Sequence, residues 1–326
     1  MFKSVICILL SLLLISGLSA CQPIATQPAT PQPALRSAPG LTVSVRGASP
    51  IHIPDAGETY LVDENMPFVG QFNLQLLHDE AVAFTLTCLL DHLQIPCTPD
   101  VPLLQDLTLE PGETLVLRLE TPALRRGSHD FSITYWLNPF ADHADPLADS
   151  RVFFSTYRQR ISLIVGENST PPSIATERLS GQRAYRELDY LYANPQENPF
   201  GEYGSIVIET HLHAAPNELV DLYVHLNNRL NIDMDMAVTA FVDYQQVPLF
   251  RNGAWQIPLY VAVPTHTWQP VAVQFQAPSE PGLYEFVVVG ALFPYARMDA
   301  LPETDEVIDV TIMRAHSSAR ILLEVE

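Results

Sequence analysis

The stretch CLLDHLQIP, at Cys88–Pro96, has a second version in AFVDYQQVP, at Ala240–Pro248. The two align without gaps, and aspartate, glutamine and proline recur in register. Further matches in the same order pair Gly127–Phe131 with Gly282–Phe286, Leu137–Phe140 with Leu292–Tyr295, and Arg160-Ile161 with Arg320-Ile321. Because colinear matches separated by about one domain length indicate an internal repeat, the chain is predicted to contain two copies of one unit.

Both copies have the pattern of short β-strands. β-Branched and aromatic residues alternate with polar ones or form short apolar runs, as in Phe84–Cys88, Thr114–Leu119, Val271–Phe275 and Tyr284–Val289. Pro-Gly turns at 111–112 and 281–282 and an Asn-Gly turn at 252–253 punctuate such runs. The prediction is an all-β chain with two tandem β-sandwich domains, residues 41–167 and 204–326, joined by a connector at 168–203.

The connector opens with Asn168–Pro172. Within it, Tyr185, Leu188 and Tyr192 have helical spacing, which predicts a short amphipathic helix ending at Asn194-Pro195. The alternative is an irregular loop whose tyrosines pack on a neighbouring sandwich, because short helices are marginal without tertiary support.

The first unit also resembles a known module. A strand, the turn Leu109–Glu113, a second strand, and then Gly127 opening the strand at Phe131–Ile133 resemble the bacterial immunoglobulin-like modules of the cell-adhesion-related type, CARDB. The second unit keeps the strand at Gly282 but has Thr265–Thr267 where the first has its Pro-Gly-Glu turn. The resemblance implies an immunoglobulin-like sandwich that binds or spaces a partner, and it carries over no catalytic residues.

The N-terminus has the layout of an export signal. Lys3 precedes an apolar run from Val5 to Leu18, which is too short to span a membrane before the chain turns to Gln22-Pro23. Leu18-Ser19-Ala20-Cys21 resembles the lipobox of bacterial lipoproteins. We therefore expect a signal peptide at 1–20, lipid such as palmitate on Cys21, a Pro-rich tether at 21–40, and an extracytoplasmic protein anchored to a membrane of the cell envelope. An ordinary secretory signal with a chance cysteine is the alternative.

Composition excludes several functions. A formal net charge of −20 with few clustered arginines opposes nucleic-acid binding. Lys3 is the only lysine, so a chain cleaved before Cys21 has no side-chain amine for Schiff-base or Ser-Lys chemistry. The common local motifs of hydrolases, zinc proteases and dinucleotide-binding enzymes are missing, which favours a noncatalytic protein without a cofactor. A Ser-His-Asp site assembled from distant residues stays open.

Two cysteines remain after the leader and the anchor. Cys88 and Cys97 flank a hairpin-like stretch, and folding about His92-Leu93 would place them opposite each other on neighbouring strands. We predict a disulfide, as expected in an exported compartment. Two reduced buried thiols are the alternative, since Pro96 lacks an N–H and can shift the register.

The most suggestive polar set is Glu209, His211 and His213 on a strand predicted at Ile206–His213. Alternation places all three on one face, and two imidazoles with a carboxylate suit zinc or copper. A hairpin through Ala214–Asn217 would add a neighbouring strand that faces outward at Asp221, Tyr223 and His225. The competing interpretation is a solvated polar face.

Both units also insert acidic loops. The carboxylates are Asp142, Asp145 and Asp149 in the first unit and Asp299, Glu303, Asp305 and Glu306 in the second. Several carboxylates on one loop can bind calcium, although the spacing fits no EF-hand and polar loop tips are common.

Taken together, these features predict a noncatalytic envelope lipoprotein whose sandwiches bind or space a protein or a polysaccharide. The alternative function is metal handling, of zinc or copper, through the strand face of His211 and His213.

Overall fold

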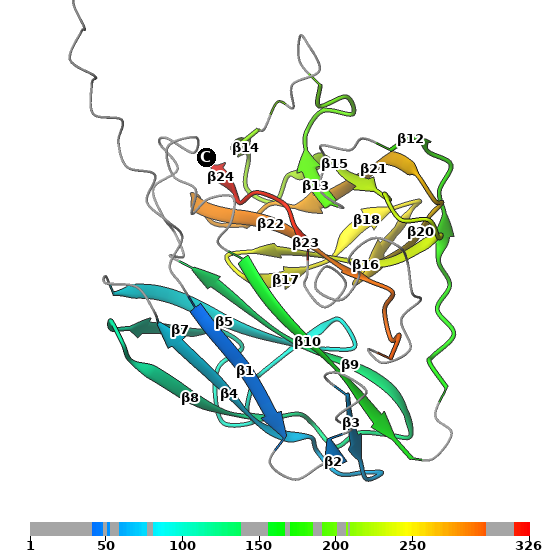
Figure 1. Cartoon of the computed structure of the whole chain (residues 1–326). Helices are drawn as coiled ribbons and strands as arrows, with labels where there is room; N and C mark the ends of the chain where they lie inside the picture. Colours follow the sequence, from blue (N-terminus) through cyan, green and yellow to red (C-terminus); the bar gives the residue numbers. More distant parts are fainter. Residues whose placement is uncertain are drawn as a thin grey trace, which may run out of the picture. The chain divides into compact units, whose positions relative to one another are not determined.

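The computed structural model describes residues 41–47, 51–52, 59–76, 81–137, 156–166, 170–184, 191–200, 207, 209–297 and 316–326. Residues Ala38–Glu326 form one compact unit. Every regular element in the described ranges is a β-strand, which confirms the all-β prediction (Figure 1). No helix in these ranges is long and apolar enough to cross a membrane.

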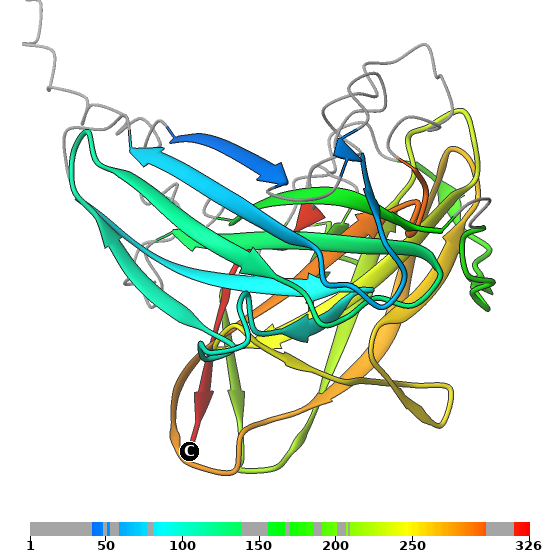
Figure 2. The ribbon, with the colours of Figure 1, turned by 90° about the horizontal axis from the view of Figure 1, so that it is seen from below.

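The first two sheets come from the N-terminal half. Their strands are β1 (Leu41–Gly47), β2 (Ile51–His52), β3 (Thr59–Val62), β4 (Val69–Leu76), β5 (Val82–Leu90), β6 (Leu93–Ile95), β7 (Gln105–Leu109), β8 (Thr114–Glu120), β9 (Gly127–Leu137) and β10 (Thr156–Val165). One sheet has the order β1-β4-β8, and the other has the order β2-β3-β10-β9-β5-β6 with β7 also paired to β5. Figure 2 shows the ribbon of these strands from below, coloured from blue to green.

A second pair of sheets follows. Its strands are β11 (Glu177–Arg178), β12 (Gln182–Arg183), β13 (Leu191–Asn194), β14 (His211–Ala214), β15 (Leu219–Asn227), β16 (Met234–Val242), β17 (Gln245–Val247), β18 (Leu249–Arg251), β19 (Ala254–Gln256), β20 (Leu259–Val263), β21 (Thr267–Gln276), β22 (Gly282–Leu292), β23 (His316–Ser317) and β24 (Ile321–Val325). One sheet runs β11-β20-β16-β22-β24-β14, with β17 on β16 and β23 on β22, and the other runs β13-β15-β21-β18-β19, with β12 on β21.

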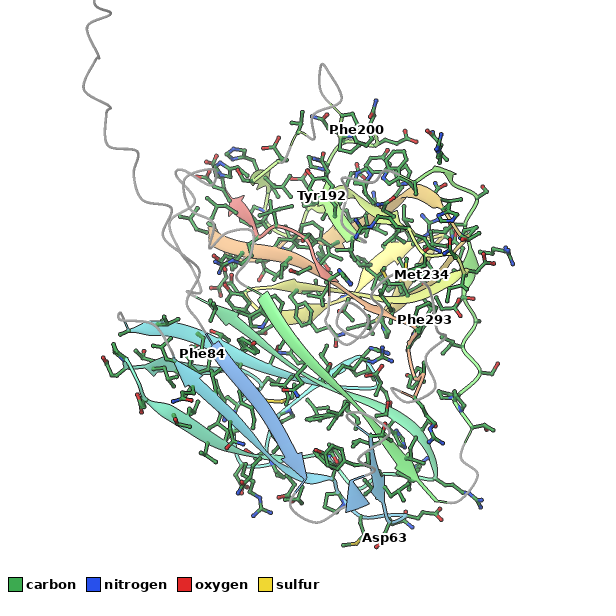
Figure 3. The ribbon with its side chains drawn as sticks, in the orientation of Figure 1. Asp63, Phe84, Tyr192, Phe200, Met234 and Phe293 are labelled. Carbon is green, nitrogen blue, oxygen red and sulfur yellow. A yellow bond between two sulfur atoms is a disulfide. The ribbon has the colours of Figure 1, made fainter. Side chains whose placement is uncertain are left out.

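Each pair of sheets encloses its own apolar core, so both are sandwiches of the immunoglobulin-like kind. In the first, Phe72 from β4 joins Phe84 from β5 and Phe131 from β9 in one buried cluster. In the second, Val273 from β21 packs in a cluster with Met234 from β16 and other residues of the facing sheet. Figure 3 labels one side chain of each cluster, Phe84 and Met234. Alternate residues along these strands point into the cores, as the period-two pattern predicts.

The repeated CLLDHLQIP and AFVDYQQVP segments form the same hairpin twice. The central residues, Asp91-His92 in one and Asp243-Tyr244 in the other, all have φ between 46° and 65°. Positive φ at both central positions defines the type I′ turn, whose twist suits a two-residue hairpin. In each copy the aspartate accepts a hydrogen bond from the backbone N–H of a residue on the next long strand, at 3.1 Å from Asp130 and 2.8 Å from Glu285.

A second repeated contact follows the turn before each long strand. The ring Nε2 of His129 lies 2.8 Å from the carbonyl oxygen of Arg125, and the hydroxyl of Tyr284 donates to the carbonyl oxygen of Glu280, also at 2.8 Å. The two contacts occupy equivalent positions in the aligned repeats, so the duplication extends to the tertiary contacts.

The predicted disulfide is confirmed, but the predicted register is wrong. Cys88 and Cys97 are bonded, with Cα atoms 5.2 Å apart. The turn centres on Asp91-His92 instead of His92-Leu93, because the aspartate side chain is bound by the next strand, and so Cys88 pairs with Ile95. Cys97 lies beyond Pro96, past the end of β6.

The connector contributes strands to the second sandwich. β11 pairs with β20, β12 with β21 and β13 with β15. Tyr192 lies in β13, where its hydroxyl donates to the carbonyl of Val207 at 2.7 Å, so the helix predicted to end at Asn194-Pro195 is wrong at that end. Tertiary pairing overrides the weak helical spacing; Tyr185 and Leu188 are outside the described residues.

The two sandwiches meet through a buried apolar cluster. Leu89 and Trp136 of the first sandwich pack with Phe241, Tyr244, Val287 and Val289 of the second. The Trp136 ring centre lies 5.3 Å from that of Phe241 and 5.1 Å from that of Tyr244. Ser132 and Thr134, on the same face of β9 as Trp136, are also fully buried. The outer face of this sheet is therefore an interior surface of the protein.

Polar contacts surround this apolar cluster. His92, at the tip of the first hairpin, points its ring edge-on toward Tyr295, with centroids 5.3 Å apart. Arg160 forms an ion pair with Asp130 at 2.7 Å and donates hydrogen bonds to the carbonyl oxygens of Leu292 and Phe293. The interface thus combines aromatic packing with charge-assisted hydrogen bonds.

Candidate metal-binding cluster

Three potential metal ligands converge at one edge of the second sandwich. His211 and His213 lie on β14, the last strand of its sheet, and Glu324 lies on the neighbouring β24. The two strands are parallel, and His213 is directly opposite Glu324 in the register. Leu212 and Ala214 alternate with the histidines and are buried in the core, which turns both imidazoles to the outer face.

Both imidazoles approach the same carboxylate oxygen. His211 Nε2 lies 3.1 Å from Glu324 Oε2, and His213 Nδ1 lies 3.3 Å from it. The ring centres of the histidines are 4.3 Å apart. Their side chains are 40% and 64% exposed, and that of Glu324 is 30% exposed, so the cluster is open to solvent. A shallow hollow beside it is lined by His213, Ala214, Ala215, Glu218 and Glu326.

The structure revises the ligand set expected from sequence. Glu209 precedes β14 and is not one of the three convergent residues. The sequence-based interpretation missed Glu324. The alternation of residues along Ile321–Val325 indicates that Glu324 is a surface carboxylate. Its partner on the neighbouring strand, His213, is more than a hundred residues away in the sequence. Long-range pairing of parallel strands leaves no local signal in the sequence.

The predicted neighbouring strand face is wrong. β15 follows Ala214–Asn217 but joins the opposite sheet, where it pairs with β13 and β21. Asp221 consequently accepts a hydrogen bond from Gln274 Nε2 at 2.8 Å, and Tyr223 and His225 lie on the other sheet from His211. The loop is thus a corner between two sheets instead of a hairpin within one.

His225 is instead a buried aromatic residue. It is 1% exposed, stacks on Trp268 with an interplanar angle of 7°, and its Nε2 lies 3.0 Å from the carbonyl oxygen of Gln196. Burial lowers the pKa of His225 to about 4, and the contact with the Gln196 carbonyl only partly opposes that shift. At neutral pH the ring is uncharged and donates from Nε2 to the Gln196 carbonyl oxygen. This hydrogen bond holds the segment after β13 in place.

Another histidine is positioned by two acceptors. His129 Nδ1 lies 2.8 Å from Asp91 Oδ2, and its Nε2 faces the Arg125 carbonyl oxygen. The hydrogen bond to Asp91 raises the pKa of His129, although partial burial opposes it. Both ring nitrogens thus face acceptors within the fold, which assigns this ring a structural role.

Each sandwich contains a buried ion pair at the equivalent place. Asp130 pairs with Arg160 at 2.7 Å, and Glu285 pairs with Arg320 at 3.2 Å. All four side chains are at most 3% exposed. Arg320 also donates to the hydroxyl of Tyr244 at 3.1 Å. These pairs fix the hairpin tips and the interface, because a buried charge requires a partner.

Several predicted positions lie outside the described residues. These are Cys21 with its lipobox, the first acidic loop with Asp142, Asp145 and Asp149, and the second with Asp299, Glu303, Asp305 and Glu306.

No protein-family model and no curated protein matches the chain. Among solved structures, the chain is similar to the CARDB domain of the PF1109 protein from Pyrococcus furiosus, whose crystal structure is in complex with di-metal ions. The sequence identity is 14%, the match covers 43% of this chain and 100% of that one, and the TM-score is 0.26. Red sea bream transglutaminase matches at 12% identity over 88% of this chain and 31% of that one, with a TM-score of 0.22. The native conformation of E. coli alpha-2-macroglobulin matches at 10% identity over 88% and 17%, with a TM-score of 0.26.

Proposed function

We propose that this protein is a noncatalytic lipoprotein of the cell envelope, anchored through lipid on Cys21, whose two sandwiches act as one rigid body that binds or spaces a protein or polysaccharide partner. The lipobox-like segment Leu18–Cys21 supports the anchor, and the Pro-rich stretch after it supports a tether. The absence of local catalytic motifs in the sequence supports a binding role.

The observation that carries the proposal is the interface between the sandwiches. A flexible pair of domains would have a small, wet contact, whereas here Trp136 is fully buried among side chains of the second sandwich. Gln94 and Gln246 add hydrogen bonds in both directions across the contact. A body of this kind holds a constant distance between its ends, which suits a spacer or a rigid binding platform.

The anchor is tested by replacing one cysteine. Cys21→Ser removes the thiol that would be acylated, so the protein should leave the membrane fraction and lose incorporation of labelled palmitate. Cys7→Ser is the matched control, because it changes a cysteine inside the leader. Labelling that persists in Cys21→Ser, or is lost only in Cys7→Ser, would refute lipidation at this position.

The partner is tested by photo-crosslinking on intact cells. Trp255 on β19 is 46% exposed beside Phe250, with ring centres 5.2 Å apart, so a photoreactive side chain at 255 samples the surface of the second sandwich. Val116 on β8, 55% exposed, serves as the comparison site on the first sandwich. Protease-sensitive adducts indicate a protein, and glycosidase-sensitive adducts indicate a polysaccharide. If neither position gives an adduct on cells, the binding role is rejected in favour of spacing alone.

A further inference from the structure

We propose that His211, His213 and Glu324 form a site for one divalent transition-metal ion, Zn²⁺ or Cu²⁺. Among the described residues, they form the one group of three or more histidine, cysteine, aspartate or glutamate side chains whose ligand atoms all lie within 4.8 Å of one another. Two imidazoles and one carboxylate are a donor set that both ions accept, and hard cations such as Ca²⁺ prefer oxygen ligands.

The two distances between Glu324 and the imidazoles agree with this chemistry, and all three ligand atoms lie within 4.8 Å of one another. In a tetrahedral zinc site with bonds of about 2.1 Å, neighbouring ligand atoms lie about 3.4 Å apart. The distances from Glu324 Oε2 to the two imidazole nitrogens are 3.1 and 3.3 Å. An ion can therefore take the place of the shared hydrogen-bonding protons with small rotations of exposed side chains.

The backbone holds the three residues in this arrangement. Leu212 and Leu323, beside the ligands in sequence, are buried in the core and fix the two strands. The backbone N–H of Leu322 donates to the carbonyl oxygen of Thr210 at 2.8 Å, and the backbone N–H of Glu326 donates to the carbonyl oxygen of Ala214 at 3.0 Å. Backbone pairing therefore continues at both ends of β14. The ligands therefore come from rigid strands, which reduces the entropy that binding must overcome.

The surroundings favour a cation with an open coordination position. The hollow next to His213 also presents Glu218 and Glu326, and the chain carries a formal net charge of −20. Three protein ligands leave the fourth position of a tetrahedral ion to water or to a donor from another molecule. A bound ion would also connect the edge strand β14 to the last strand β24.

The test is calorimetric titration of the detergent-solubilised full-length protein with ZnCl₂ and, separately, CuCl₂. We expect one ion per chain, and we expect His211→Ala/His213→Ala to weaken binding more than about tenfold. Glu324→Gln keeps the shape of the side chain but removes its charge, and should also weaken binding. His266→Asn is the control, because His266 is an exposed histidine in a turn with φ of 52°, which asparagine accepts.

Circular dichroism verifies that each variant is folded, which is expected because the replaced side chains are exposed or, for Glu324, partly exposed. The proposal is overturned if no ion binds, if the double-alanine variant binds as the unchanged protein does, or if Ca²⁺ competes equally with Zn²⁺. Because the readout is metal binding in solution, it does not depend on the lipid anchor or on a partner.

Discussion

Gln94 and Gln246 exchange the same hydrogen bond in both directions. The backbone N–H of Gln94 donates to Gln246 Oε1 at 2.8 Å, and the backbone N–H of Gln246 donates to Gln94 Oε1 at 2.7 Å. Their amide groups complete the exchange, because Gln94 Nε2 donates to the Tyr244 carbonyl and Gln246 Nε2 donates to the His92 carbonyl. The glutamines occupy equivalent positions in the repeats, so the contact has the reciprocity of a two-fold symmetric dimer inside one chain.

This reciprocity predicts strong coupling between the two glutamines. Gln94→Ala and Gln246→Ala should each lower the free energy of unfolding by about 1–3 kcal/mol. Each substitution removes a side chain and leaves the partly buried groups that bonded to it without a hydrogen-bond partner. The double variant should cost less than the sum of the two, with a coupling energy of about 0.5–3 kcal/mol. Urea unfolding of all four proteins measures the cycle, and additive costs would contradict a shared network.

The interface also predicts a stabilising substitution. The hydroxyl of Thr134 is buried and has no hydrogen-bond partner among the residues that the structure describes. Thr134→Val keeps the shape and removes that hydroxyl, so the free energy of unfolding should rise by about 1 kcal/mol. Thr87→Val on the adjacent strand is the control: it removes the acceptor of the Trp136 indole N–H, 3.1 Å away, and should destabilise. A loss of stability in Thr134→Val comparable to that in Thr87→Val would count against this assignment.

His225 predicts loss of stability in acid. Its pKa is lowered to about 4 in the folded protein, while an unfolded histidine has a pKa of about 6.5. Between these values the unfolded chain binds a proton that the folded chain does not, so stability falls as pH drops through about 6.5 and levels off below about 4. The contribution from pH 7 to pH 5 is about 2 kcal/mol of lost stability.

His225→Phe should flatten this dependence in unfolding experiments at both pH values. His129 is a useful comparison, because its pKa is raised and its contribution has the opposite sign: present at low pH and lost as pH rises through its folded pKa. An unchanged slope between pH 7 and pH 5 in His225→Phe would show that other groups cause the acid sensitivity.

The buried ion pair of the second sandwich predicts that breaking it costs much stability and that a second substitution recovers most of the loss. Arg320→Met removes the guanidinium from the buried carboxylate of Glu285 and should cost about 3–5 kcal/mol. Adding Glu285→Leu should recover most of that loss, because an apolar pair can replace a buried ion pair. Arg118→Met is the surface control, since the Arg118 side chain is 66% exposed in its pair with Glu120 and should cost under about 1 kcal/mol. Equal penalties for Arg320→Met and Arg118→Met would contradict the prediction.

Local sequence patterns were sufficient for many of the strands and turns and for the repeated hairpin, but the strand predicted at Ile206–His213 begins only at His211. Asn252-Gly253 and Gly112 have the positive φ that their turn types require, and the Cys88–Cys97 disulfide forms. Patterns failed where a long-range partner decides the outcome. Tyr192 entered a strand because β15 pairs with its segment, and Ala214–Asn217 became a corner because the next strand joined the opposite sheet.

At the candidate site, too, local patterns predicted some residues and a long-range partner decided another. Alternation correctly placed His211 and His213 on one face of a strand, but it could not identify Glu324, which comes from the other end of the domain. The polar residues Thr87, Ser132 and Thr134 have the alternation of a solvent-facing surface, yet they are fully buried. A period of two separates the faces of a strand, and it does not tell whether the polar face meets water or a second domain.

This buried hydroxyl-bearing face has a consequence for a first sandwich taken by itself. Without the second sandwich, Ser132 and Thr134 would meet water, with which their hydroxyls can form hydrogen bonds. Because both sandwiches are in one chain, the effective concentration of each for the other is high, and the face is buried together with the aromatic pair of Trp136 and Phe241.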